Sequence, residues 1–117
     1  MRNLLFGLAL LACATVADAH AHLRNSVPAD GSTLSASPRS LVLNFSEAGL
    51  VTAAAIQKAG ATAQKLEPLP TKAAVQVSLA LPALPPGTYV VSWRVLSADG
   101  HVMPGKIHFT VAGGSPR

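Results

Sequence analysis

The chain has 117 residues, and its nine lysines and arginines outnumber five acidic residues to give a formal net charge of +4. This length suits one domain rather than two. The basic residues are scattered and few aromatic residues lie among them, a pattern that argues against nucleic acid as a partner.

The N-terminus has the pattern of a secretory signal peptide over residues 1–19. Arg2 precedes a short apolar run over residues 4–12, and Ala17-Asp18-Ala19 then forms a small-residue cleavage site. The run is shorter than the roughly 20 apolar residues that span a bilayer. We therefore expect an exported protein whose mature form begins at His20.

A second interpretation of the N-terminus places a lipid anchor on Cys13. Residues 10–13 resemble a bacterial lipobox, in which the cysteine is lipidated and becomes the new N-terminus, so that His20 stays internal. Leu11 is larger than the residue usually found at its position, which favours the cut after Ala19. That cut removes Cys13, the only cysteine, so we expect neither a disulfide nor a disulfide-linked partner.

The rest of the chain alternates between short apolar-patterned segments and turns rich in proline and glycine. The longest predicted strand places alternate residues from Tyr89 to Val95 on one face. Residues 46–49 are expected to break the chain between two strands, and Pro104-Gly105 is expected to form a turn. The predicted strands cover residues 20–27, 41–45, 50–58, 62–66, 75–79, 88–97 and 106–111.

These segments predict an all-β domain. Short strands without helical periodicity indicate an antiparallel β-sandwich or small barrel. The domain is expected over residues 20–112, followed by a flexible C-terminal tail at residues 113–117.

Residues from the two ends of this domain have the chemistry of a metal site. As a mature N-terminus, His20 offers a free amine and its ring Nδ1, which close a chelate ring on one metal ion. The amine loses its proton easily because its pKa is about 7.7–8.0. Asp99 adds an oxygen and His101 adds a second imidazole, while Gly100 allows a sharp turn between them. Nitrogen and oxygen donors in a tetragonal arrangement suit Cu(II).

Each half of this pattern also has a simpler explanation. Asp-Gly after a strand is a turn signal by itself, and a following histidine is often only solvated. The metal hypothesis therefore depends on the two halves occurring together in one small exported domain.

The sequence resembles the CopC family of periplasmic copper-binding proteins over nearly all of residues 20–111. The resemblance is most specific around Trp93 and Asp99. The segments that carry it are His20-Ala21-His22-Leu23, residues 26–32 (Ser-Val-Pro-Ala-Asp-Gly-Ser), Leu43-Asn44-Phe45-Ser46-Glu47, residues 86–101, and residues 105–109 with Val111.

The resemblance implies a seven-stranded Greek-key β-barrel of cupredoxin-like or immunoglobulin-like shape. It assigns Cu(II) binding to His20, Asp99 and His101, and a weak or indirect ligand role to Glu47, which is equally interpreted as a solvated turn residue. It also implies a periplasmic location, a role in copper buffering, resistance or delivery, and a CopD-like inner-membrane partner.

One departure from the family pattern concerns the second metal site that some members build in a methionine-rich loop. Residues 50–80 contain neither methionine nor histidine, and Met103 is the only methionine after the predicted cut. We therefore expect one Cu(II) ion per chain and no Cu(I) site. His22 is interpreted either as a weak extra ligand or a partner of a ligating side chain, or as an exposed strand residue, and His108 as an outward strand residue.

Three functions compete on this sequence. The leading hypothesis is a copper-binding protein without enzymatic activity. An alternative is a monooxygenase resembling the histidine-brace copper enzymes, but Asp99 would occupy the coordination position that oxygen needs. The third is a structural sandwich domain without metal, because a fold alone does not dictate function.

Overall fold

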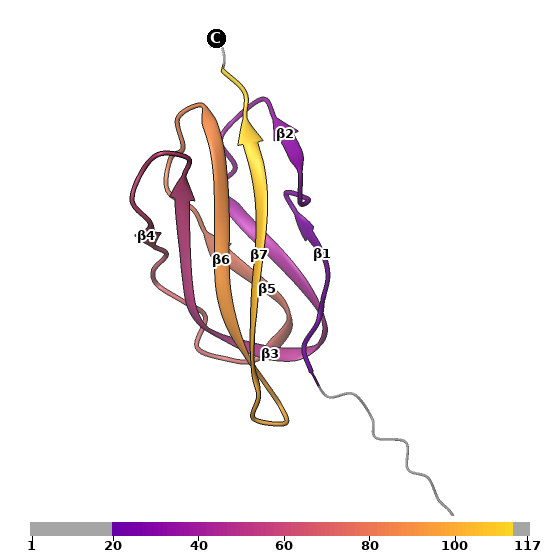
Figure 1. The fold of residues 1–117 in the computed structure, drawn as a ribbon. Coiled ribbons are helices and arrows are strands. Elements are labelled where there is room, and N and C mark those ends of the chain that lie inside the picture. Colours follow the sequence, from indigo (N-terminus) through magenta and orange to yellow (C-terminus); the bar gives the residue numbers. More distant parts are fainter. Residues whose placement is uncertain (1–19, 114–117) are drawn as a thin grey trace, which may run out of the picture.

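The computed structural model describes residues 20–113. The predicted signal peptide, the alternative lipidation at Cys13 and nearly all of the predicted tail lie outside these residues. The strands are β1 (Leu23–Val27), β2 (Ser32–Leu34), β3 (Ser40–Lys58), β4 (Gln64–Lys65), β5 (Ala74–Ala80), β6 (Gly87–Ser97) and β7 (Val102–Val111) (Figure 1). No helix long and apolar enough to cross a membrane occurs in this part of the chain.

Strand β3 builds two layers from one continuous strand. Its first part pairs with β1 and β5, and its second part pairs with β6 and β4. Figure 1 shows β3 crossing the far layer, bending at the lower end and rising beside β6. The break predicted at residues 46–49 is a bend within this strand, where the register against β5 shifts between Asn44 and Gly49. The β-sandwich prediction is confirmed.

The sheet is mixed rather than purely antiparallel. The antiparallel strands follow the order β1-β3-β6-β7, but β2 joins the far edge of β7 in parallel through Ser32, Thr33 and Leu34. The predicted antiparallel arrangement is therefore wrong at this strand. The pairing depends on contacts between residues about 77 positions apart, and so no local pattern in the sequence indicates it.

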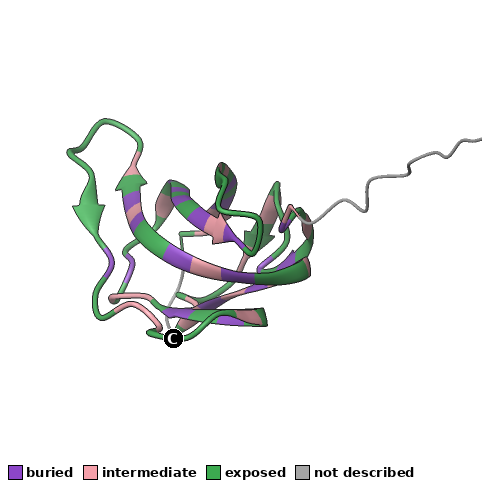
Figure 2. Cartoon of the chain, turned by 90° about the horizontal axis from the view of Figure 1, so that it is seen from below, coloured by how far each residue is buried: buried purple, intermediate pink, exposed green. Residues whose placement is uncertain are grey.

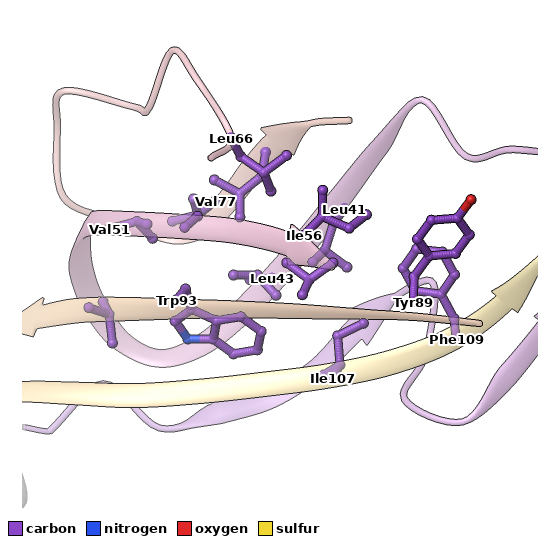
Figure 3. Close-up of a cluster of buried hydrophobic side chains, with 14 of the residues drawn as sticks. Leu41, Leu43, Val51, Ile56, Leu66, Val77, Tyr89, Trp93, Ile107 and Phe109 are labelled. Carbon is purple, nitrogen blue, oxygen red and sulfur yellow. The ribbon is translucent and has the colours of Figure 1, made fainter. Parts of the chain in front are cut away.

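The core lies between the two layers and is built by alternate residues of the strands. Figure 2 shows buried residues alternating along β3 with residues of intermediate or full exposure, and Figure 3 shows the inward side chains meeting across the layers. The predicted inward face from Tyr89 to Val95 is buried, as are Ile107 and Phe109 on β7. The Tyr89 and Phe109 rings stack with centroids 5.9 Å apart. Burial of these apolar faces is the main source of stability in a domain without a disulfide.

The turn predicted at Pro104-Gly105 is absent, because both residues lie inside β7 and pair with Arg94 and Trp93. The Trp93 indole packs directly on Gly105, where an added Cβ would lie 2.6 Å from ring carbons. Pro104 fits because this half of β7 is a sheet edge, where a missing N–H costs no ladder hydrogen bond. The glycine therefore serves packing rather than a turn.

Replacing Gly105 with alanine tests this packing. We expect Gly105→Ala to lower the free energy of unfolding by about 1–3 kcal/mol, because the buried indole has to move away from the new methyl group. Gly113→Ala is the control, since an added Cβ there meets its nearest atom only at 4.0 Å. Urea unfolding of both variants measures the difference, and equal stability would contradict the contact.

Candidate metal centre

The loop between β6 and β7 presents Asp99 and His101 at one end of the sandwich. Its backbone is closed by two hydrogen bonds: the Ser97 N–H donates to the His101 carbonyl and the Gly100 N–H donates to the Ser97 carbonyl, each at 2.9 Å. Gly100 has φ of +90°, a conformation that residues with a side chain rarely adopt. This glycine lets the chain reverse within four residues.

Within this loop, Asp99 fixes its own geometry relative to His101. The Asp99 Oδ1 atom accepts a hydrogen bond from the His101 backbone N–H at 3.1 Å. The Oδ2 atom is left to face the imidazole, 3.3 Å from His101 Nδ1. The carboxylate therefore divides its two oxygens between the loop backbone and the side-chain cluster.

His20 joins this cluster from the other end of the domain. Its Nε2 atom lies 2.9 Å from Asp99 Oδ2 and 2.7 Å from His101 Nδ1. One ligand atom from each of the three residues lies within 4.8 Å of the others. Asp99 and His20 are about one third exposed, at 29 % and 32 %, and His101 is 68 % exposed. The cluster is thus open to solvent on one side.

The structure differs from the predicted chelate in the ring nitrogen of His20 that faces the cluster. A chelate with the terminal amine uses Nδ1, but Nε2 faces Asp99 and His101. In the full sequence His20 follows Ala19, so its backbone nitrogen is an amide. The chelate between Nδ1 and a terminal amine therefore cannot form in this form of the chain. Turning Nδ1 toward a terminal amine requires a different side-chain rotamer of His20, with changes about both the Cα–Cβ and the Cβ–Cγ bonds.

The structure leaves the other candidate ligands outside this group of three. Glu47 is exposed beside the bend of β3, and the cluster does not include its carboxylate. The His22 ring lies edge-on to His20 with centroids 5.8 Å apart, also outside the group. His108 faces outward as predicted and its Nδ1 lies 2.9 Å from Asp30 Oδ1, on a different part of β7.

Two residues that the sequence analysis did not single out hold the N-terminal segment in place. Ser97 accepts a hydrogen bond from the Ala21 N–H, and Ser46 accepts one from the His22 N–H. Both serines lie within segments that carry the family resemblance, and Ser46 precedes Glu47 directly. Their position within these segments was the only indication in the sequence that the two serines matter. It did not show that their hydroxyls hold the N-terminal segment.

This arrangement defines a class: a small all-β protein whose open end gathers two imidazoles and a carboxylate at metal-binding distances. Such nitrogen and oxygen donors bind divalent transition metals. The chain belongs to the CopC family, because a sequence model of the CopC domain matches residues 23–112. The predicted family relationship is thereby confirmed.

Individual relatives support the same assignment. The chain is 36% identical to protein YobA of Escherichia coli K12, with 94% of this chain and 95% of the relative covered. It is 38% identical to copper resistance protein C of Pseudomonas syringae pv. tomato, with 92% and 91% covered. Family membership supports copper binding by this chain, and the relative's name describes copper resistance rather than catalysis.

Solved structures agree in fold. CopC from Methylosinus trichosporium OB3b superimposes with a TM-score of 0.68 at 30% identity, covering 84% of this chain and 99% of that structure. PcoC from Escherichia coli, described as a methionine-rich copper resistance protein, gives 0.61 at 32% identity, with 80% and 99% covered. The likeness extends over almost the whole of both structures.

Proposed function

We propose that this protein binds one Cu(II) ion per chain through His20, Asp99 and His101. The observation that carries the proposal is the meeting of these three side chains, within 4.8 Å of one another, in a chain of a copper resistance family. Copper is the cargo rather than a resident catalytic cofactor in this proposal. Glu47, predicted as a weak or indirect ligand, lies outside this group of three and is proposed only in that weaker role.

The donor types favour Cu(II) over Cu(I). Soft thiolate and thioether ligands select Cu(I), whereas imidazole, amine and carboxylate suit Cu(II). The whole chain has one cysteine and two methionines, and Met103 is partly buried against the core. This composition contrasts with the methionine-rich PcoC and supports a single site of hard and intermediate donors.

The proposed mature form begins at His20, after cleavage of residues 1–19. Cleavage converts the His20 backbone nitrogen from an amide to an amine, which adds a fourth donor to two imidazoles and one carboxylate. A change of the His20 rotamer then allows Nδ1 and the amine to hold the ion together. Four nitrogen and oxygen donors match the tetragonal preference of Cu(II).

We further propose that the protein acts in the periplasm, where it buffers Cu(II) or delivers it to a CopD-like inner-membrane partner. The open face of the cluster, with His101 mostly exposed, supports exchange of the ion with another protein. The same geometry disfavours a histidine-brace enzyme, because the Asp99 carboxylate lies against both imidazoles, where an oxygen substrate would need a free position.

Substitution of the loop ligands tests the site. We expect Asp99→Ala and His101→Ala each to weaken Cu(II) binding at least about 100-fold, since even outer-shell changes at metal sites cost 10–100-fold. Competition with a chromophoric chelator measures the affinity, and electron paramagnetic resonance reports the donor set. His108→Ala is the matched control, because His108 pairs with Asp30 on another part of β7. A metal-free sandwich domain would show no binding, or equal binding by all variants.

Extension of the N-terminus tests the proposed chelate. One glycine placed before His20 in a protein of confirmed N-terminal mass separates the free amine from the imidazole. We expect Cu(II) binding to weaken by about tenfold or more, because a chelate ring is lost while all side chains remain. Equal affinity for the two forms would show that the terminal amine is not a ligand.

A further inference from the structure

The segment that carries His20 lies outside the regular strand ladder. Strand β1 begins only at Leu23, and chain ends that are not tied down are poorly ordered. Yet the His20 ring is held within 2.9 Å of Asp99. Something other than the regular strand pairing of β1 must fix residues 20–22.

Ser97 makes the first of these connections. Its side-chain oxygen accepts a hydrogen bond from the Ala21 N–H at 2.9 Å, and the two residues are 3 % and 2 % exposed. The backbone of Ser97 also closes the loop between β6 and β7, because it donates a hydrogen bond to the His101 carbonyl and accepts one from the Gly100 N–H. One buried residue therefore connects the N-terminal segment to the loop that carries Asp99 and His101.

Ser46 makes the second connection from the bend of β3. Its hydroxyl accepts from the His22 N–H at 3.0 Å and donates to the His20 carbonyl at 3.2 Å. A hydroxyl has one donor and two acceptor positions, so one serine can make both bonds. The Ser46 N–H also donates to the His22 carbonyl at 2.7 Å. Backbone groups on both sides of Ala21 are thus held.

We propose that Ser97 and Ser46 are positioning residues of the copper site, which hold the His20 backbone against the loop of Asp99 and His101. The inference rests on the proposed function, because it concerns the affinity of that same site. Neither serine is offered as a ligand. Their contribution is to order the N-terminal segment before the ion arrives. The conformational entropy of that segment is then not lost on binding, which raises the affinity.

Removal of each hydroxyl tests this role. We expect Ser97→Ala and Ser46→Ala each to weaken Cu(II) binding about tenfold, the effect of losing one well-placed hydrogen bond. Ser46→Thr keeps a hydroxyl and should restore most of the affinity. Ser78→Ala on β5 is the control, since Ser78 is exposed and far from the site in the fold.

Hydrogen exchange of the metal-free protein gives a second readout. The Ala21 amide should exchange at least about tenfold faster in Ser97→Ala, while core amides of β6 keep their protection. If exchange quickens but Cu(II) affinity is unchanged, the serines are only structural and the inference is overturned. If the wild-type protein does not bind Cu(II), the proposed function fails as well, and the two failures are thereby distinguished.

A separate observation concerns the outer face of the sheet formed by β4, β3, β6 and β7. A shallow hollow of about 630 Å³ lies there, with small residues such as Ala53, Ala55 and Ser92 on its floor. Lys65, Arg94 and Lys106 line it and no acidic residue does. None of these three cations takes part in an ion pair among the described residues.

The spacing of these cations follows from the strand register. Lys65, Ala55, Ser92 and Lys106 are successive partners across the four strands, so about 14 Å separates the two lysines at roughly 4.8 Å per strand step. An extended peptide repeats its side chains on one face every two residues, and four residues span about 13.6 Å. Carboxylates four residues apart therefore match the two lysines, and Arg94 lies to one side of this row, two residues along β6 from Ser92.

We infer that this hollow docks an extended acidic segment of a partner protein. The charge and the spacing of the three cations both complement alternating carboxylates. The small side chains on the floor of the hollow let the backbone of a partner peptide approach the sheet. An anionic membrane is the less suitable occupant, because recognition of lipid surfaces uses clusters of about four to eight basic residues, and the hollow offers three. The hollow lies partly on the β6–β7 hairpin, whose loop carries Asp99 and His101, but none of the three cluster residues lines it.

A short acetylated peptide of alternating glutamate and serine is the probe. We expect the peptide to bind, to weaken with added salt, and to lose about two- to fivefold in affinity for each of Lys65→Ala, Arg94→Ala and Lys106→Ala. Lys72→Ala, outside the hollow, is the control. Absence of peptide binding, or binding only to phosphatidylserine vesicles, would overturn the inference, and neither result depends on copper.

Discussion

The bend of β3 is the constraint on which both the sandwich and the cluster of His20, Asp99 and His101 depend. At Gly49 the strand passes so close to its neighbours that an added Cβ would lie 2.4 Å from Val95 Cγ2 and 3.0 Å from the Ala21 Cβ. The bend carries the chain from one layer to the other and leaves just enough room for Ala21 beside β6. A bulkier residue at this point would separate the layers and displace the N-terminal segment together.

Much of the fold follows from local patterns in the sequence, and the parts that do not are set by distant contacts. Alternation of apolar residues identified β5, β6 and the C-terminal half of β7, because one face of each strand is buried. Strand β2 was missed since its three residues have a pattern only in relation to β7. Pro104-Gly105 has the composition of a turn, but packing of the Trp93 indole on the glycine overrides that preference.

The three residues of the cluster could be identified from the sequence, whereas the way they are held could not. His20, Asp99 and His101 carry donor groups of a recognisable kind, and the fold brings them together. The orientation of the His20 ring and the roles of Ser46 and Ser97 depend on contacts between residues up to 81 positions apart. Serine is too common in turns and strand ends for its type alone to mark such a role. Glu47 lies outside the group of three, and its role as a weak or indirect ligand stays a prediction.

The edge of β7 has a consequence for how the protein behaves in a crowded compartment. Between Val102 and Ile107 no strand of the described residues pairs with the outer side of β7. An open edge is a template on which a second copy can add a strand and start an aggregate. Pro104 removes one donor from that edge, and Lys106 places a charge where a neighbouring copy would place its own. The same hairpin that presents Asp99 and His101 thus resists edge-to-edge association between copies of the chain.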